Sequence, residues 1–219
     1  KRLNFVRPLG ADAADTRMEI FLPPPVKKEA ARIVQEHFGG IPTCLIALHP
    51  GGSDAYKQWP LGSFATLGRF LQETYGAHLL IIGNRSERPL GEELARQIGA
   101  PALVTGGHYN LLTVAALLHN CHLLVGNDSG PLHLGLALKT PSIGVLGADD
   151  PRRIGPYRVS WGACLFKEDA CPRNPCITKR CPRSVCLEAI RPEEVIRLIQ
   201  DWWALHYLPA APKGEAHGG

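Results

Sequence analysis

Short apolar runs without polar alternation recur along the chain, and each is followed by a few glycine or polar residues and then by a segment with helical periodicity. The runs predict strands at residues 43–48, 78–82, 102–105, 122–125 and 142–146. The periodic segments predict helices at residues 27–38, 63–75, 89–98, 110–119, 131–138 and 192–207. Strands that are apolar on both faces and alternate with helices are typical of a parallel sheet covered on both sides. The predicted fold class is therefore α/β with a Rossmann-like parallel sheet, and its ligand site is expected at the carboxyl ends of the strands.

Residues that start and stop helices mark the ends of these segments. Glycines at 39–40 and 76 are expected to end the first two helices, and Ser63 and Asn110 to cap the second and fourth. Three prolines at 23–25 predict a stiff stretch that stops any helix, so an interdomain linker is expected at residues 1–26. The folded domain is predicted at 27–208, with a long loop before its last helix and a disordered tail at 209–219.

The composition is that of a globular protein, with 45% hydrophobic and 20% charged residues. No apolar run is long enough to cross a bilayer, and residues 1–10 lack the cleavage site of a signal peptide, so a cytoplasmic location is expected. The net charge of +4 is mild and dispersed. It suits an anionic small ligand or peripheral association with an anionic membrane, and it argues against a nucleic-acid partner.

One polar triplet lies between two glycines where a strand is expected to meet a helix, in the run from Gly126 to Gly130. Glycine lets the backbone approach a ligand, and the unpaired amides of a helix start attract phosphate oxygens. Asp128, Ser129 and Gly130 would then hold a diphosphate. Equally, Asp128 or Ser129 could simply cap the helix.

Two further loops follow strands of the same sheet. In the first, Lys57 could neutralise a phosphate and Ser53 could donate a hydrogen bond to it, although a solvated surface lysine is the commoner case. In the second, which begins at Gly83, Glu87 could accept hydrogen bonds from ribose hydroxyls or could stabilise a helix start. All three loops are expected to converge on one edge of the sheet.

Taken together, these loops resemble the glycosyltransferase family of bacterial lipopolysaccharide heptosyltransferases. The resemblance rests on the His-Pro-Gly-Gly run at 49–52 with Lys57 and the Trp-Pro pair at 59–60, on the run at 127–131 with His133, and on residues 141–147 leading to 150–151 and 155–157. It implies the C-terminal domain of a GT-B enzyme, with Ser53, Lys57, Gly83, Glu87, Asp128, Ser129, Gly130 and His133 as the donor-binding residues. The donor implied is ADP-heptose or a related nucleotide sugar, with no required cofactor.

The resemblance covers residues 15–205 and only the C-terminal half of the family. Its acceptor site, for a lipopolysaccharide core sugar, and an aspartate proposed as general base lie in the N-terminal half. Inverting transfer needs a base to take the acceptor proton while the diphosphate leaves. We therefore expect this chain to bind the donor and to transfer nothing alone, with no catalytic residue of its own. A location at the inner face of the inner membrane is implied for the whole enzyme.

Seven cysteines need a separate account. Two lie in apolar surroundings and are expected to be inert, whereas Cys171, Cys176, Cys181 and Cys186 recur at five-residue intervals in the loop at 164–186. Four thiolates could hold zinc or an iron-sulfur cluster, although this spacing is only loosely compatible with the usual closer pairs. Structural disulfides, free thiols and redox sensing remain open alternatives.

A rival hypothesis makes the chain a non-catalytic nucleotide-binding or interaction module with the cysteine loop as its docking element. A zinc-ribbon nucleic-acid binder is weaker, because the basic loop lacks interleaved aromatic residues.

Overall fold

Within the described part of the chain, six parallel strands form one sheet in the order β3-β2-β1-β4-β5-β6. A computed structural model describes residues 18–156, 159–174, 176, 181 and 184–203, together with Pro8 and Gly10. The strands are β1 (Leu45–His49), β2 (His78–Ile81), β3 (Ala102–Val104), β4 (Leu123–Asn127), β5 (Ser142–Val145) and β6 (Gly162–Leu165). The predicted α/β class and parallel sheet are confirmed, and the strand order is that of a Rossmann fold.

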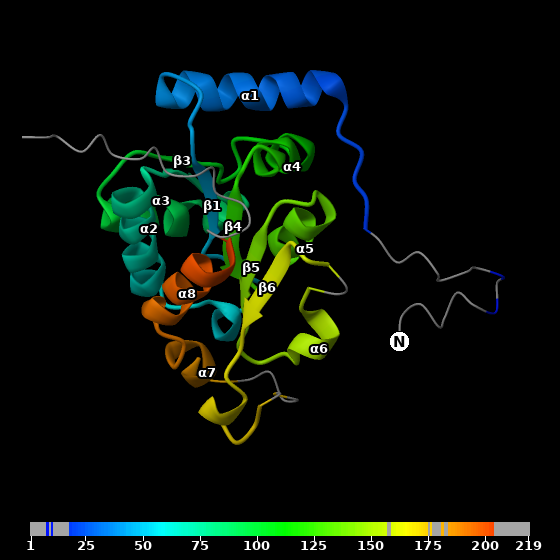
Figure 1. The fold of residues 1–219 in the computed structure, drawn as a ribbon, viewed down its shortest axis with the longest axis vertical. Coiled ribbons are helices and arrows are strands. Elements are labelled where there is room, and N and C mark those ends of the chain that lie inside the picture. Colours follow the sequence, from blue (N-terminus) through cyan, green and yellow to red (C-terminus); the bar gives the residue numbers. More distant parts are fainter. Residues whose placement is uncertain are drawn as a thin grey trace, which may run out of the picture.

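Helices connect successive strands and cover both faces of the sheet (Figure 1). They are α1 (Pro24–Phe38), α2 (Leu61–Tyr75), α3 (Arg88–Ile98), α4 (Leu111–His119), α5 (Gly130–Ala137), α6 (Pro151–Ile154), α7 (Val185–Glu188) and α8 (Pro192–Leu198). Single turns of 3-10 helix form at η3 (Ala55–Lys57), η4 (Arg85–Glu87) and η5 (Glu168–Ala170), and a π-helical turn, η6 (Ile199–Trp203), follows α8. None of the described helices is both long and apolar enough to cross a membrane.

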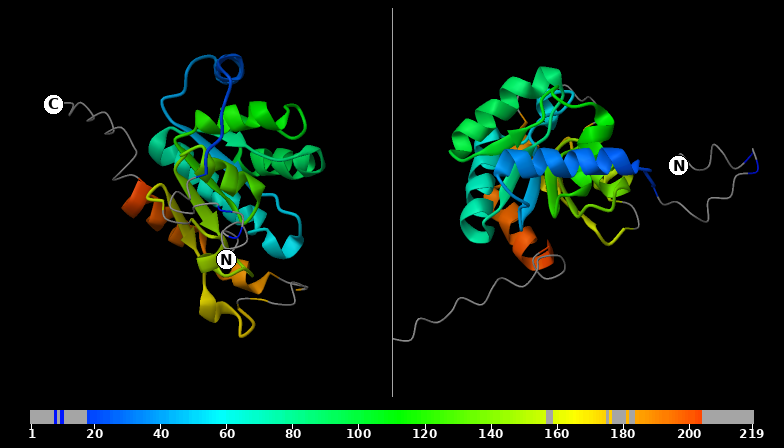
Figure 2. Two further views of the ribbon diagram at one scale, coloured as in Figure 1. Left: turned by 90° about the vertical axis from the view of Figure 1, so that its right-hand side faces the viewer. Right: turned by 90° about the horizontal axis from the view of Figure 1, so that it is seen from above.

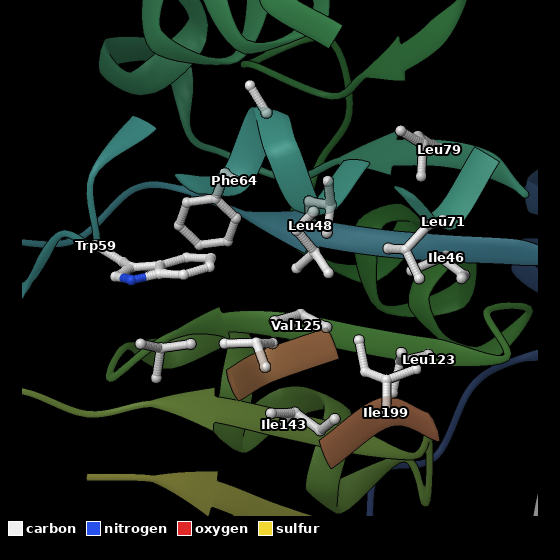
Figure 3. Packing of buried hydrophobic residues seen from close by; sticks show 14 of the residues in the cluster. Ile46, Leu48, Trp59, Phe64, Leu71, Leu79, Leu123, Val125, Ile143 and Ile199 are labelled. Atoms are coloured by element: carbon white, nitrogen blue, oxygen red, sulfur yellow. The ribbon is translucent and has the colours of Figure 1, made fainter. Parts of the chain in front are cut away.

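Two apolar cores lie on opposite faces of the sheet. The larger packs α2, α3 and α8 against one face of the strands, with Leu48, Trp59, Phe64 and Ile199 among its buried side chains (Figure 3). The smaller packs α1 and α4 against the other face. Figure 2 shows α1 stacked outside α4. Burial on both faces explains why the strands read as continuous apolar runs.

Several predicted boundaries are corrected by the structure. The first helix begins at Pro24 rather than residue 27, because proline is tolerated in the first helical turn, where its missing N–H has no partner to lose. The second begins at Leu61 with Pro60 as its N-cap, so the prediction of Ser63 as a cap is wrong. Asn110 does cap α4, its side chain accepting from the Thr113 amide at 2.9 Å. Glycines 39 and 76 end their helices in the left-handed conformation, as predicted.

The long loop predicted before the last helix contains β6, which the apolar pattern did not indicate. Its residues are only partly buried, as an edge strand requires, so they show no strong apolar signal. The short helices α6 and α7 also form here, beyond the carboxyl ends of the strands in the lower part of Figure 1. The predicted tail, most of the predicted linker and the end of the predicted 192–207 helix lie outside the described residues.

Candidate functional site

The strand order reverses between β1 and β4, and the loops that follow these two strands are joined by one buried amide. Asn127, the last residue of β4, has no exposed surface. Its Oδ1 accepts from the Trp59 amide at 3.0 Å, and its Nδ2 donates to the carbonyls of Pro50 and Gly51 at 2.9 Å each. All three partners lie after β1. Asn127 therefore fixes the loop that carries Lys57 at the crevice where ligands bind in open α/β sheets.

Lys57 lies between two carboxylates contributed by two other strand ends. Its Nζ is 3.1 Å from Asp128 Oδ2, after β4, and 3.3 Å from Asp149 Oδ2, after β5. The three side chains are only 11–19% exposed. Burial is the largest influence on the pKa of Lys57 and lowers it, but the hydrogen bonds and charges of Asp128 and Asp149 together raise it above its usual value. The ammonium group is therefore held charged and fixed in direction at the sheet edge.

Helix α5 begins beside this triad without a side-chain cap. Ser129 is its N-cap residue, but the Ser129 hydroxyl donates to the Asn127 carbonyl at 3.3 Å instead of accepting from a helical amide. The alternative that Asp128 or Ser129 caps this helix is therefore wrong. A Cβ built on exposed Gly130 would meet nothing within 4 Å. Open space thus lies at the positive end of α5, where an anion is favoured.

His133, one turn into α5, faces the same carboxylate. Its Nε2 is 3.9 Å from Asp128 Oδ1, and the side chain is 44% exposed. The structure therefore brings together five of the predicted donor-binding residues: Lys57, Asp128, Ser129, Gly130 and His133. Ser53 differs from them, because its exposed hydroxyl donates to the neighbouring Asp54 at 2.8 Å.

Glu87 binds backbone amides from two loops. One carboxylate oxygen accepts from Gly52 at 2.9 Å and the other from Asn84 at 2.9 Å, while the Asn84 side chain accepts from the Glu87 amide in return. A Cβ at Gly51 would overlap the Glu87 carboxylate, so a larger residue there would have to displace this carboxylate from its two amides. A Cβ at Gly83 would lie 3.1 Å from the Glu87 Cβ. Glu87 thus stabilises the start of η4 and joins the β2 loop to the β1 loop; its role toward a ribose stays a prediction.

Two residues of the site were missed as functional side chains in the sequence. Asp149 pairs with Lys57 but adjoins Asp150, whose helix-capping role at α6 is the more familiar pattern. Asn127 lies in the run from Gly126 to Gly130, but its hydrogen bonds to the loop after β1 follow only from the pairing of β1 with β4.

His49, the last residue of β1, is 2% exposed, and its Nδ1 has no hydrogen-bond partner within the described structure. Burial lowers the pKa of His49 to about 4, against a smaller raising effect of the Glu87 charge. Between about pH 4 and pH 6.5, the His49 imidazole is therefore protonated in the unfolded chain and neutral in the folded chain. The contribution of neutral His49 to the free energy of unfolding should be complete above pH 6.5 and should be lost as the pH falls toward about 4.

We expect this loss to reach roughly 3 kcal/mol. Urea unfolding at a series of pH values would measure it, with His49→Gln as the test and the exposed His37→Gln as the matched control. The His49 variant should lose much of the acid slope while the control keeps it. Equal slopes in both variants would contradict the assignment.

The cysteine loop lies directly beside this site. Cys171, Cys176, Cys181 and Cys186 all line one hollow, whose other walls include Tyr56, next to Lys57, and Ala148, next to Asp149. All seven cysteines are among the described residues, and no disulfide joins them. As placed, no three described His, Cys, Asp or Glu side chains are close enough to hold a metal ion.

Residues 6–184 match the family model of glycosyltransferase family 9 (heptosyltransferase). The chain belongs to this family. Among curated relatives, lipooligosaccharide heptosyltransferase 2 of Campylobacter jejuni is 26% identical over 163 residues, which cover 71% of this chain and 50% of the relative. The chain thus spans about half the length of the curated family members that it matches.

Solved structures of family members share the fold. A family 9 glycosyl transferase from Veillonella parvula superposes with a TM-score of 0.78 at 22% identity, covering 93% of this chain and 59% of that one. The Escherichia coli heptosyltransferase WaaC, solved with ADP, superposes with a TM-score of 0.61 at 23% identity, covering 91% of this chain and 54% of that one. At these identities the likeness establishes the Rossmann-like fold.

Proposed function

We propose that this chain is the donor-binding half of a glycosyltransferase that transfers heptose from ADP-heptose to a lipopolysaccharide core sugar. The observation that carries the proposal is the placement of charged Lys57 beside the uncapped start of α5. A cation beside the positive end of a helix, with open space in front of Gly130, is a place where a diphosphate is favoured.

A diphosphate at this site would have to compete with two carboxylates for Lys57. Asp128 and Asp149 both pair with this ammonium group. A diphosphate would offer Lys57 a second set of anionic oxygens and would lie at the positive end of α5 at the same time. Support for the nucleotide comes from WaaC, which has been solved with ADP and with ADP-2-deoxy-2-fluoro heptose.

Sugar transfer requires a general base that this half of the enzyme is not proposed to supply. Lys57 and the start of α5 can stabilise the leaving diphosphate, but transfer also needs a base at the acceptor hydroxyl. The carboxylates nearest to the start of α5 are held by Lys57, and Glu87 by two amides, so none is placed as that base. We therefore propose that the chain binds the donor and is catalytic only together with an N-terminal domain that holds the acceptor. We also propose that the whole enzyme acts in the cytoplasm, at the inner face of the inner membrane.

Titration calorimetry with ADP and ADP-heptose tests the binding claim, and one glycine substitution locates the site. Gly130→Ala adds a methyl group to open space, so the free energy of unfolding should change by less than about 1 kcal/mol. The same methyl group would obstruct a phosphate against the start of α5, and we expect ADP affinity to fall by roughly tenfold.

Gly62→Ala is the matched control, because Gly62 also lies in the first turn of a helix and also faces open space. It should leave ADP affinity unchanged. Absence of binding heat with both nucleotides, checked by a second method such as a thermal shift, would refute donor binding. Equal effects of the two substitutions would place the diphosphate elsewhere.

A further inference from the structure

Two carboxylates share one cation at the donor site, and Asp149 contributes the second of them. Asp149 lies between the end of β5 and the start of α6. Its Oδ2 is 3.3 Å from Lys57 Nζ, and its side chain is 19% exposed. The next residue, Asp150, pairs with a cation of its own, since its Oδ1 is 2.9 Å from Arg152 Nε. Asp149 therefore places a largely buried negative charge directly on the cation of the donor site.

The charges that meet at Lys57 do not balance. Asp128 Oδ2 is 3.1 Å from the same Nζ, so one ammonium group faces two carboxylates and the three groups sum to a net charge of −1. His133 adds a positive charge only when it is protonated, and it faces Asp128 rather than Asp149. A phosphate that binds Lys57 therefore meets one negative charge that no cation offsets.

The repulsion from Asp149 reaches any phosphate that Lys57 binds. A hydrogen bond from an ammonium group to an anionic oxygen is about 2.7–2.9 Å long. A phosphate oxygen bonded to Lys57 Nζ thus lies no more than about 6 Å from Asp149 Oδ2, whatever its direction. Like charges repel appreciably at this separation, because the effective dielectric constant near largely buried groups is about 20 rather than about 80.

The two nucleotides of the proposed reaction differ in charge at this place. In an ADP-sugar each phosphate has one ionised oxygen, because the second phosphate is esterified to the sugar. In free ADP the terminal phosphate can lose a further proton, with a pKa of about 6 for groups of this kind. Above neutral pH, ADP therefore brings nearly one more negative charge to the site than the sugar nucleotide does.

We infer that Asp149 is a specificity-determining residue that favours the sugar nucleotide over free ADP. The inference rests on the proposed donor site, in which Lys57 binds the diphosphate. The charge of Asp149 weakens the binding of both nucleotides, and it weakens that of ADP more because ADP brings the larger charge to the same place. Since ADP is the product of the proposed transfer, Asp149 promotes product release and keeps the site open to the next donor.

Titration calorimetry at pH 8 with ADP and with ADP-heptose tests this role through Asp149→Asn. Asparagine has nearly the same shape and keeps an oxygen that can accept from Lys57, so the change removes the charge alone. We expect affinity for ADP to rise roughly tenfold and affinity for ADP-heptose roughly twofold, which changes their ratio about fivefold. Glu36→Gln is the matched control, because it removes one exposed negative charge from α1 and should leave both affinities unchanged.

Three results would overturn the inference. An unchanged ratio would show that Asp149 does not distinguish the two nucleotides. Weaker binding of both would make Asp149 only a support for Lys57. Unchanged affinity for ADP with weaker binding of ADP-heptose would assign to Asp149 a contact with the sugar instead of a repulsion.

A second neutral variant and a folding check complete the test. Circular dichroism shows whether Asp149→Asn is folded, and Asp149→Ser, which removes the same charge, should change the ratio in the same direction. If the unmodified chain binds neither nucleotide, the donor site itself is refuted and this role of Asp149 with it. The three contrary results above would leave the donor site standing, so the two failures are distinguishable.

Discussion

Replacing Lys57 with alanine is expected to weaken ADP binding by roughly 10- to 100-fold. A hydrogen bond to a charged group contributes about 1.5–3 kcal/mol, which corresponds to that range of affinity. Two further effects act in the same direction. Asp128 and Asp149 lose their common cation, and the carboxylates left behind would repel the incoming diphosphate.

Calorimetry on the chain measures this loss, with Lys28→Ala as the matched control. Lys28 is an exposed lysine of α1, which packs on the opposite face of the sheet from α2. Its replacement by alanine changes the net charge by the same amount as Lys57→Ala. The control should bind ADP as the unmodified chain does. An affinity within twofold of normal for Lys57→Ala, with folding intact by circular dichroism, would contradict a phosphate role for Lys57. Asp149→Asn tests the pairing from the other side, because it frees Lys57 from one competitor.

The central strands could be predicted because their apolar runs are buried on both faces of the sheet. β1 and β4 show this best, since all residues of both strands are buried. The helix starts were harder to predict, because proline and serine can each occupy several positions there. Pro60 and Ser63 show this directly, since the helix begins after Pro60 and contains Ser63.

The candidate site could be predicted only in part, because its residues are held by contacts between distant segments. Lys57 and Asp128 stand in recognisable runs, so their chemistry could be proposed from the sequence. Their geometry depends on Asn127, which acts through the neighbouring strand, and on Asp149, which follows β5. The sequence predicts Glu87 as a ribose ligand or a helix stabiliser, and only the fold shows that it also accepts from the Gly52 amide. Long-range pairs of this kind leave no local periodicity.

Truncating Trp59 should produce the largest loss of stability among these changes. Its side chain is 1% exposed and lies against Phe64 (Figure 3). The two rings pack edge-to-face with centroids 4.9 Å apart. Its Nε1 donates to the Ile190 carbonyl at 2.8 Å, just before α8. We expect Trp59→Ala to lower the free energy of unfolding by about 3–5 kcal/mol, through lost burial and an unfilled cavity.

Denaturant unfolding followed by far-ultraviolet circular dichroism measures the change without relying on the removed fluorophore. Phe21→Ala is the control, because this large aromatic side chain is 82% exposed, and it should cost under about 0.5 kcal/mol. Trp59→Phe separates the two contributions: it keeps most of the apolar surface, leaves the Ile190 carbonyl without its donor and should cost about 1–3 kcal/mol. A loss below about 1 kcal/mol for Trp59→Ala would contradict the packing role. Because the Trp59 amide is also held by Asn127, two residues from Lys57, the alanine variant should bind ADP more weakly as its loop loosens.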